Sequence, residues 1–135
     1  MIKLVNLAKH YDRLAAVDSL NLEVQPGEIF GFLGPNGAGK TTTIRVMMGI
    51  LKPTSGQVFL GGYDVERQPK EAKAICGFIP DRPFIYEKLS GCEFLEFVGK
   101  LHGVEPIRLE RRIFDLLELF GLARWQVELV ERYSY

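Results

Sequence analysis

The sequence predicts an α/β protein in which a strand-rich part is followed by a helical part. Three observations support this fold class. Short apolar runs separated by turn residues fill roughly the first eighty positions. A glycine-rich segment lies between one of these runs and an amphipathic helical pattern, and beyond it the later part of the chain has helical apolar spacing. With 135 residues, the chain is long enough for one domain with a sizeable core.

The composition excludes several classes of protein. Hydrophobic residues make up 47% and charged residues 25% of the chain, which is typical of a globular protein rather than a disordered one. Lys and Arg number 17, as do Asp and Glu, so bulk charge gives no reason to expect a nucleic-acid partner. No signal peptide or membrane-length apolar run occurs, so we expect a cytoplasmic protein without direct membrane insertion. Cys76 and Cys92 are expected to be free thiols.

The first part of the chain is expected to contain mostly strands. The runs "IKLVNLAKHY" and "AVDSLNLEV" predict two strands, followed by a turn at Pro26 and Gly27. The nearly continuous apolar run "EIFGFLG" predicts a strand buried on both faces. "SGQVFLGGYDV" predicts a further strand ended by Gly61 and Gly62. "QPKEAKAI" predicts a short helix, and "CGFIP" a buried strand closed by Pro80.

Three longer helices are also expected. "KTTTIRVMMGIL" has an apolar face formed by Ile44, Met47, Met48 and Leu51, and Lys52 and Pro53 are ordinary stop signals. Ser90 and Glu93 fit a capping box that starts the second helix. Its expected apolar positions are Phe94, Phe97, Val98 and Leu101. Pro106 opens and Gly121 stops the third helix. Its expected apolar face is Ile113, Leu116, Leu117 and Phe120.

The segment "GPNGAGKTTT" fits G-x-x-x-x-G-K-[ST], the phosphate-binding P-loop pattern. The residues expected to bind nucleotide are Gly34, Pro35, Asn36, Gly37, Ala38, Gly39, Lys40, Thr41 and Thr42. Glycines at positions 34, 37 and 39 are expected to adopt positive φ and turn backbone N–H groups towards an anion. Lys40 supplies charge for the outer phosphates, and Thr41 a hydroxyl oxygen suited to Mg²⁺. The following helix adds its N-terminal amides and dipole.

The longer stretch "FGFLGPNGAGKTTTIRVMMGILKPTSGQVFLGG" resembles the nucleotide-binding domain of ATP-binding cassette (ABC) transporters, most specifically at "LKPTSG". The resemblance covers Ile2 to Tyr135 and is nearest to bacterial multidrug or antibiotic exporters. It implies a truncated α/β P-loop NTPase core of ABC type with an antiparallel β layer and a helical subdomain. The partial domain would span 1–135, with the β layer and core in 1–80 and the helical subdomain in 81–135.

The same resemblance implies ligands, partners and a location. The ligands would be ATP and Mg²⁺. In a full-length protein, a second ATPase domain and a membrane-spanning transporter subunit would be partners, and that subunit would hold the domain at the cytoplasmic face of the membrane.

The resemblance implies roles for three further residues. Tyr11 stands where the family has an aromatic residue that stacks on adenine, although an ordinary tyrosine at a strand end has the same pattern. Val17 stands where the family packs a small apolar residue against the base or sugar. Asp81 replaces the glutamine of the family's Q-loop. Its carboxylate can still ligate Mg²⁺ or hold a water, and the alternative is a turn cap before Pro83.

The family's residues for ATP hydrolysis do not occur in the sequence. No apolar strand ends in the Asp-Glu of a Walker B motif, and no switch histidine follows; Asp115 and Glu118 lie in a helical pattern. "ERYSY" resembles the approach to the signature motif, with Tyr133, Ser134 and Tyr135 as its first three residues, so we expect the chain to end inside that motif. ATP binding is therefore expected, whereas the sequence leaves open whether this chain is an enzyme.

The sequence leaves two alternatives open. One is a truncated fragment that binds no nucleotide, which a thermal shift with Mg-ATP would distinguish. The other is a small P-loop kinase. A kinase would need a substrate pocket with clustered arginines after the P-loop, whereas Arg108, Arg111 and Arg112 lie on a helical pattern without one.

Overall fold

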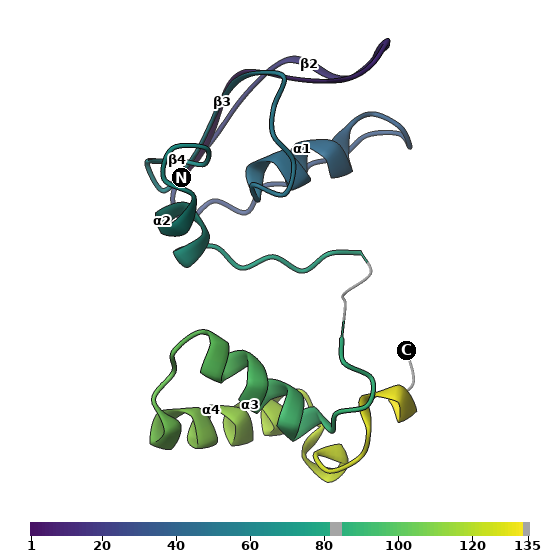
Figure 1. Cartoon of the computed structure of the whole chain (residues 1–135), viewed down its shortest axis with the longest axis vertical. Helices are drawn as coiled ribbons and strands as arrows, with labels where there is room; N and C mark the ends of the chain where they lie inside the picture. Colours follow the sequence, from purple (N-terminus) through teal and green to yellow (C-terminus); the bar gives the residue numbers. More distant parts are fainter. Residues whose placement is uncertain (82–84, 134–135) are drawn as a thin grey trace. The chain divides into compact units, whose positions relative to one another are not determined.

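The computed structural model describes residues 1–81 and 85–133. These residues form two compact units, Met1–Ile79 and Pro80–Tyr135, each with its own core. Figure 1 shows the strands and short helices of the first unit and the longer helices of the second. Each unit is described by itself.

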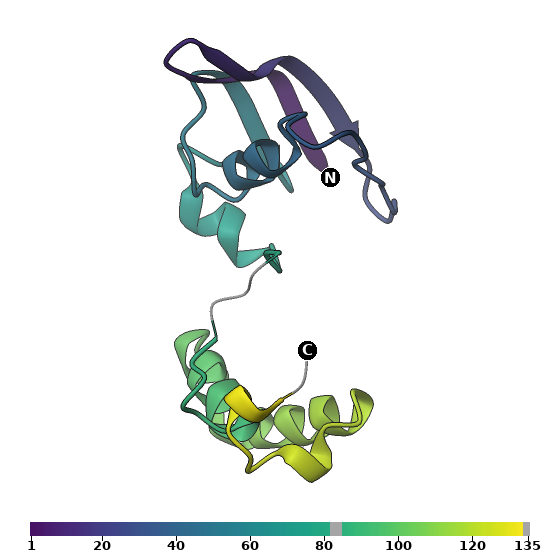
Figure 2. The same cartoon turned by 90° about the vertical axis from the view of Figure 1, so that its right-hand side faces the viewer.

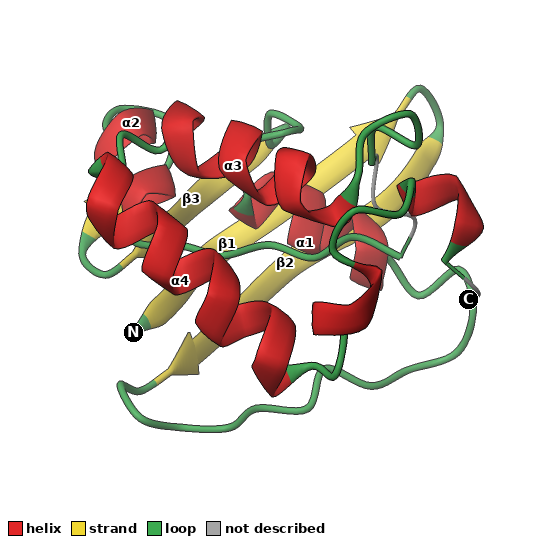
Figure 3. Ribbon diagram, turned by 90° about the horizontal axis from the view of Figure 1, so that it is seen from below, coloured by secondary structure: helices red, strands yellow, loops and turns green. Residues whose placement is uncertain are grey.

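The first unit is built on an antiparallel sheet with the strand order β2-β1-β3-β4. Figure 3 shows β1 lying between β2 and β3. The predictions of two initial strands and of a later strand ended by the glycine pair are confirmed. The strands are β1 (Ile2–Tyr11), β2 (Leu14–Val24), β3 (Ser55–Leu60) and β4 (Tyr63–Asp64).

One short helix packs on this sheet and carries part of the core. Helix α1 (Lys40–Met47) contacts β2 and β3, as Figure 2 illustrates. Its most buried side chains are Thr43 and Val46, each 1% exposed, which the predicted face did not include. Of the predicted face, Met47 and Leu51 pack against the core. The helix also ends earlier than predicted. The amide of Leu51 donates to the carbonyl oxygen of Arg45 at 3.2 Å, which closes the helix end about one turn before the predicted stop.

Two predicted buried strands are not strands in the structure. The segments 29–33 and 77–79 form no strand. Leu33 and Ile79 are each 90% exposed, whereas Phe30 is 45% and Phe78 38% exposed. A strand needs ladder hydrogen bonds to a neighbouring strand, and the described sheet of the first unit offers none at these positions. The predicted short helix is present as α2 (Pro69–Ala74).

The second unit is helical, as predicted. Helix α3 (Gly91–Leu101) begins with the predicted capping box, in which the Glu93 amide donates to Ser90 Oγ at 3.2 Å and the Ser90 amide donates to Glu93 Oε2 at 2.8 Å. Helix α4 (Pro106–Leu119) begins at the predicted proline. The core of this unit consists of Leu109, Ile113 and Leu117, with Cys92 and Leu95 of α3 packed against it.

The packed faces of these helices differ in part from the predicted faces. On α3, Phe97 is 40% and Leu101 71% exposed, while Gly99 is buried. A Cβ added at Gly99 would overlap the Leu109 side chain, so the glycine leaves room for this residue of α4. The packing of Leu109 against Gly99 therefore helps to decide which stripe of α3 is buried. On α4, Phe120 is exposed although it was expected in the apolar face.

The end of the described chain folds back on the start of α3. The amide of Val130 donates to the Leu89 carbonyl oxygen at 2.9 Å, and the Cys92 amide donates to the Gln126 carbonyl oxygen at 3.0 Å. Two short 3₁₀ helices, Ala123–Trp125 and Val130–Arg132, flank this connection. In the described ranges, no helix has the length and apolar character needed to cross a bilayer.

Candidate nucleotide-binding site

The P-loop residues form an exposed loop that ends at the first turn of α1. Figure 1 shows this loop extending from the start of the helix. Gly39 is the N-cap residue of α1 and has a φ of 80°, and Gly37 has a φ of 83°. Positive φ was also expected at Gly34, but that prediction is wrong, because the residue does not adopt the left-handed region. Pro35, Asn36 and Ala38 are exposed in the same loop.

A bulge in β2 contacts the end of the P-loop. Lys9 pairs with Val17 while His10 pairs with Ala15, so Ala16 is an extra residue in the ladder. A Cβ added at Gly39 would overlap the carbonyl oxygen of Ala16. Glycine is therefore required at position 39 for two reasons. One is its positive φ, and the other is the close approach of β2. Sequence reasoning missed Ala16, because a backbone contact leaves no residue-type signal.

The ammonium group of Lys40 lies across the loop that precedes its own helix. Lys40 Nζ donates to the carbonyl oxygen of Gly34 at 2.6 Å and to that of Pro35 at 2.7 Å. The first turn of α1 contains no acidic residue. A positive charge thus stands over the loop, next to a helix N-terminus that favours anions. These residues fit a phosphate group.

The three threonines after Lys40 have different surroundings. Thr41 is exposed and Thr42 is half-buried in the first turn of α1. Thr43 is 1% exposed, and its Oγ1 donates to the Gly39 carbonyl oxygen at 2.9 Å. Thr41 is thus available to a metal ion, whereas Thr43 holds the helix start to the loop. Sequence reasoning missed this role of Thr43.

The two residues assigned to the base and sugar lie on β1 and β2. Tyr11 ends β1 and is 43% exposed, with Lys9 Nζ 5.1 Å from the centroid of its ring. Val17 is 8% exposed and belongs to the core of the first unit. Its Cγ2 lies 3.2 Å from the position that a Cβ of Gly39 would take. The structure therefore brings Val17 to the P-loop, mainly as a packing residue.

The structure also explains why "LKPTSG" follows the loop helix. Thr54 Oγ1 accepts from the His10 amide at 2.9 Å, and the Thr54 amide donates to the Ala8 carbonyl oxygen at 2.8 Å. A Cβ at Gly56 would overlap the Asn6 carbonyl oxygen. This motif therefore joins the start of β3 to β1, the strand that carries Tyr11.

The remaining assigned residues belong to the second unit. Asp81 is exposed, and its proposed neighbour Pro83 lies outside the described residues. The hydroxyl of Tyr133 donates to the Trp125 carbonyl oxygen at 2.7 Å, and burial raises the pKa of Tyr133 above its ordinary value. Ser134 and Tyr135 lie outside the described residues as well. The role of Asp81 at a metal ion stays a prediction.

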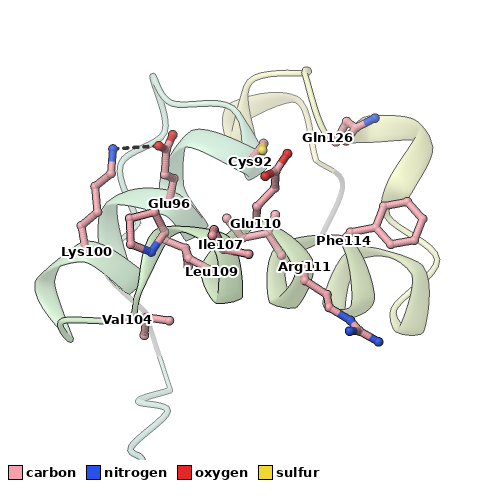
Figure 4. A pocket seen from close by; sticks show the side chains of 12 residues that line it. Cys92, Glu96, Lys100, Val104, Ile107, Leu109, Glu110, Arg111, Phe114 and Gln126 are labelled. Carbon is pink, nitrogen blue, oxygen red and sulfur yellow. Dashed lines mark ion pairs between the residues drawn. The ribbon is translucent and has the colours of Figure 1, made fainter.

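A hollow of about 760 Å³ lies between α3 and α4 in the second unit. Figure 4 shows its mixed lining, with Lys100 reaching towards Glu96, an ion pair with a separation of 2.7 Å. Ile107 and Phe114 contribute apolar surface, and both are largely exposed. None of the residues assigned to nucleotide binding lines this hollow. We therefore do not regard this hollow as the candidate nucleotide-binding site, although it is large.

Comparison with known proteins agrees with the geometry of the loop. The family model described as "ABC transporter" matches residues 17–135. The bacitracin transport ATP-binding protein BcrA of Bacillus licheniformis is 40% identical over 99% of this chain. The daunorubicin resistance ATP-binding protein DrrA3 of Streptomyces coeruleorubidus is 38% identical over 93% of this chain. The chain spans 43% of the first relative's length and 40% of the second's.

Two solved structures have the same fold as this chain. A structure described as the ATP-binding subunit of an ABC transporter has a TM-score of 0.87 and 28% identity, and the match covers 98% of this chain and 55% of that chain. The ATP-binding cassette MJ0796, solved as a dimer bound to ADP and Pi, has a TM-score of 0.84 and 23% identity, with 99% and 63% covered. The fold is accordingly a truncated P-loop α/β fold, and the chain belongs to the ABC transporter family as an N-terminal part of its ATP-binding protein.

Proposed function

We propose that this chain binds ATP with Mg²⁺ through the loop Gly34–Thr41. The observation that carries the proposal is the position of Lys40 Nζ, held over the loop by the carbonyl oxygens of Gly34 and Pro35. Two neutral carbonyl oxygens are weaker partners for an ammonium group than a phosphate is. The names of the relatives support the same ligand, since BcrA and DrrA3 are both described as ATP-binding proteins.

Each loop residue has a distinct task in this proposal. Lys40 binds the outer phosphates, while the amides around Gly37 and Gly39 face them at the start of α1. The exposed hydroxyl of Thr41 holds the magnesium ion. Magnesium, when bound, neutralises charge on the phosphate oxygens. Tyr11 and Val17 form part of the site for the base and sugar.

The activity of a complete protein is a wider proposal. We propose that two such domains together hydrolyse ATP and drive a membrane-spanning subunit, which holds them at the cytoplasmic face of the membrane. The names of the relatives, which refer to bacitracin transport and daunorubicin resistance, favour an exporter of antibiotic-like compounds. The structurally similar ATP-binding cassette MJ0796 was solved as a dimer, which supports a second ATPase domain as partner.

The decisive experiment compares two lysine variants of the chain. Lys40→Ala removes the charge over the loop, and charge-assisted hydrogen bonds contribute ~1.5–3 kcal/mol. The Kd for Mg-ATP should rise by roughly tenfold to a hundredfold. Lys70→Ala removes an exposed lysine on α2 and should leave the Kd unchanged. Equal Kd values for Lys40→Ala and the unmodified chain in calorimetric titration would overturn the assignment.

A thermal shift addresses the alternative of a fragment that binds no nucleotide. Mg-ATP at a hundred times its Kd should stabilise the folded chain by about 2.7 kcal/mol. The melting temperature of the unmodified chain should therefore rise with ATP concentration, and that of Lys40→Ala should rise less. A melting temperature that is independent of ATP would support the alternative.

A further inference from the structure

Lys9 contacts the aromatic ring to which the base-binding role is assigned. Its Nζ lies 5.1 Å from the centroid of the Tyr11 ring, within the range of a cation–π interaction. The two residues are separated by one position on β1, so their side chains lie on the same face of the strand. The ring of Tyr11 is only partly covered, with 43% of the residue exposed. One face of the ring thus has a cation, and the ring still reaches solvent.

The strand register relates this pair to the P-loop. Lys9 pairs directly with Val17 of β2, and residues opposite one another in an antiparallel ladder have side chains on the same face. Val17 Cγ2 lies 3.2 Å from the position of a Cβ on Gly39. The extra residue of the bulge is in β2, so the alternation of β1 from Lys9 to Tyr11 is uninterrupted. Lys9 and Tyr11 therefore lie on the sheet face that carries the start of α1.

We propose that Lys9 is a positioning residue for the nucleotide base, acting through Tyr11; this rests on the proposed binding of ATP at the P-loop. The ammonium covers one face of the ring and fixes its orientation. The base stacks on the face that Lys9 leaves open. Base–aromatic stacking needs a ring that is held in place but not enclosed, and the exposure of Tyr11 meets this condition. Lys9 thus affects affinity through the base, whereas Lys40 affects it through the phosphates.

Two ligands distinguish the proposed role of Lys9 at the base from that of Lys40 at the phosphates. Mg-ATP and Mg-tripolyphosphate both offer phosphates, but only ATP offers a base. Binding of both is measured calorimetrically for the unmodified chain, Lys9→Met, Lys9→Arg and the control Lys3→Met. Lys3 is on the same strand and pairs with Glu23 at 3.3 Å, so its loss removes an equal charge without touching the Tyr11 ring.

Lys9→Met should raise the Kd for Mg-ATP about two- to fivefold, because the ring loses its cation. The Kd for Mg-tripolyphosphate should stay unchanged. Lys9→Arg should retain the affinity for ATP, since a guanidinium group also packs on an aromatic face. Lys3→Met should match the unmodified chain for both ligands.

Two results would overturn the inference while leaving the proposed function intact. The first is ATP binding by the unmodified chain with the same Kd for Lys9→Met. The second is an equal loss for ATP and tripolyphosphate in Lys9→Met, which would mean a general charge effect. Failure of the unmodified chain to bind either ligand would overturn the proposed function itself, and this inference with it.

A measurement without ligand tests the contact directly. The Lys9 side-chain methylene protons nearest the ammonium should show an upfield ring-current shift in NMR spectra of the free chain. This shift should disappear in Tyr11→Leu and persist in Tyr11→Phe. Its absence in the unmodified chain would contradict the inference, because the ring would then not be held by Lys9.

Discussion

The carbonyl oxygen of Ala16 lies against Gly39, so closely that a Cβ added to the glycine would overlap it. Ala16 is the extra residue of the bulge in β2, and Gly39 is the N-cap residue of α1. The bulge therefore directs a backbone oxygen into the space that a side chain would fill. This contact joins the sheet to the end of the P-loop and sets where α1 begins.

Gly39→Ala should destabilise the first unit more than Gly37→Ala. Both glycines have a φ close to 80°, so both variants carry the left-handed strain of about 1–2 kcal/mol. Only Gly39→Ala adds an overlap with Ala16, since nothing lies within 4 Å of a Cβ at Gly37. Overpacking of this kind costs a further ~1–3 kcal/mol. Urea unfolding of the two variants measures the difference, and equal stabilities would show that the Ala16 contact is loose in solution.

Tyr11→Ala should weaken ATP binding, whereas Tyr11→Phe should not. The face of the ring carries the proposed contact with the base, and phenylalanine keeps that face. Loss of one stacked base contact corresponds to ~1–3 kcal/mol, or a Kd higher by roughly fivefold to more than a hundredfold. Fluorescence titration with a labelled ATP provides the Kd values. If the two variants behave identically, Tyr11 is a structural residue at the end of β1.

Ser90→Ala should destabilise the helical unit by about 1 kcal/mol, because it removes the N-cap of α3. Far-UV circular dichroism during urea unfolding follows this loss. Thr42→Ala, a variant of similar size in the other unit, should leave the unfolding of α3 and α4 unaffected. An unchanged helical transition in Ser90→Ala would contradict the capping role.

The same capping box predicts a pH dependence. The hydrogen bonds from the Ser90 backbone amide and then from its side chain lower the pKa of Glu93 below the ordinary glutamate value. The folded unit therefore binds this proton less readily than the unfolded chain does. The stabilisation is complete above about pH 4.3, the unfolded pKa, and is lost as the pH falls through the lowered folded value. Glu93→Ala should reduce the loss of stability in acid, and the control Glu110→Ala on α4 should not.

The exposed apolar segments should make the isolated chain prone to association. Ile79 and Leu33 are each 90% exposed in segments whose sequence is typical of buried strands. By resemblance, the strand that carries the Asp-Glu motif of the family belongs beside them. Ile79→Lys should therefore lower the binding of a hydrophobic dye and raise solubility. Ile107→Lys, at a 79% exposed position on α4, serves as the matched control and should have a smaller effect.

ATP hydrolysis by this chain should not exceed that of its Lys40→Ala variant. The sequence contains no strand that ends in Asp-Glu, so no such pair is available to hold magnesium and orient the attacking water. Steady phosphate release is measured with both proteins at equal concentration. Lys40-dependent release would mean that another residue, with Asp81 the first to test, performs this task.

The sequence by itself determined the features whose causes are local. The P-loop pattern places Gly39 and Lys40 within one turn of the helix start, and the capping box joins Ser90 to Glu93 three positions later. Pro106 marks the start of α4 in the same way. Each of these depends on residue types separated by a few positions, so the spacing in the sequence is already the spacing in the structure.

Only the tertiary structure decided the features that depend on distant segments. The contact of Ala16 with Gly39, the approach of Leu109 to Gly99 and the cation beside Tyr11 follow from strand register and helix packing. The buried stripe of α3 was misjudged for this reason, because several of its faces are apolar enough to pack. The segments 29–33 and 77–79 show the same limit, since an apolar run becomes a strand only when a neighbouring strand accepts its hydrogen bonds.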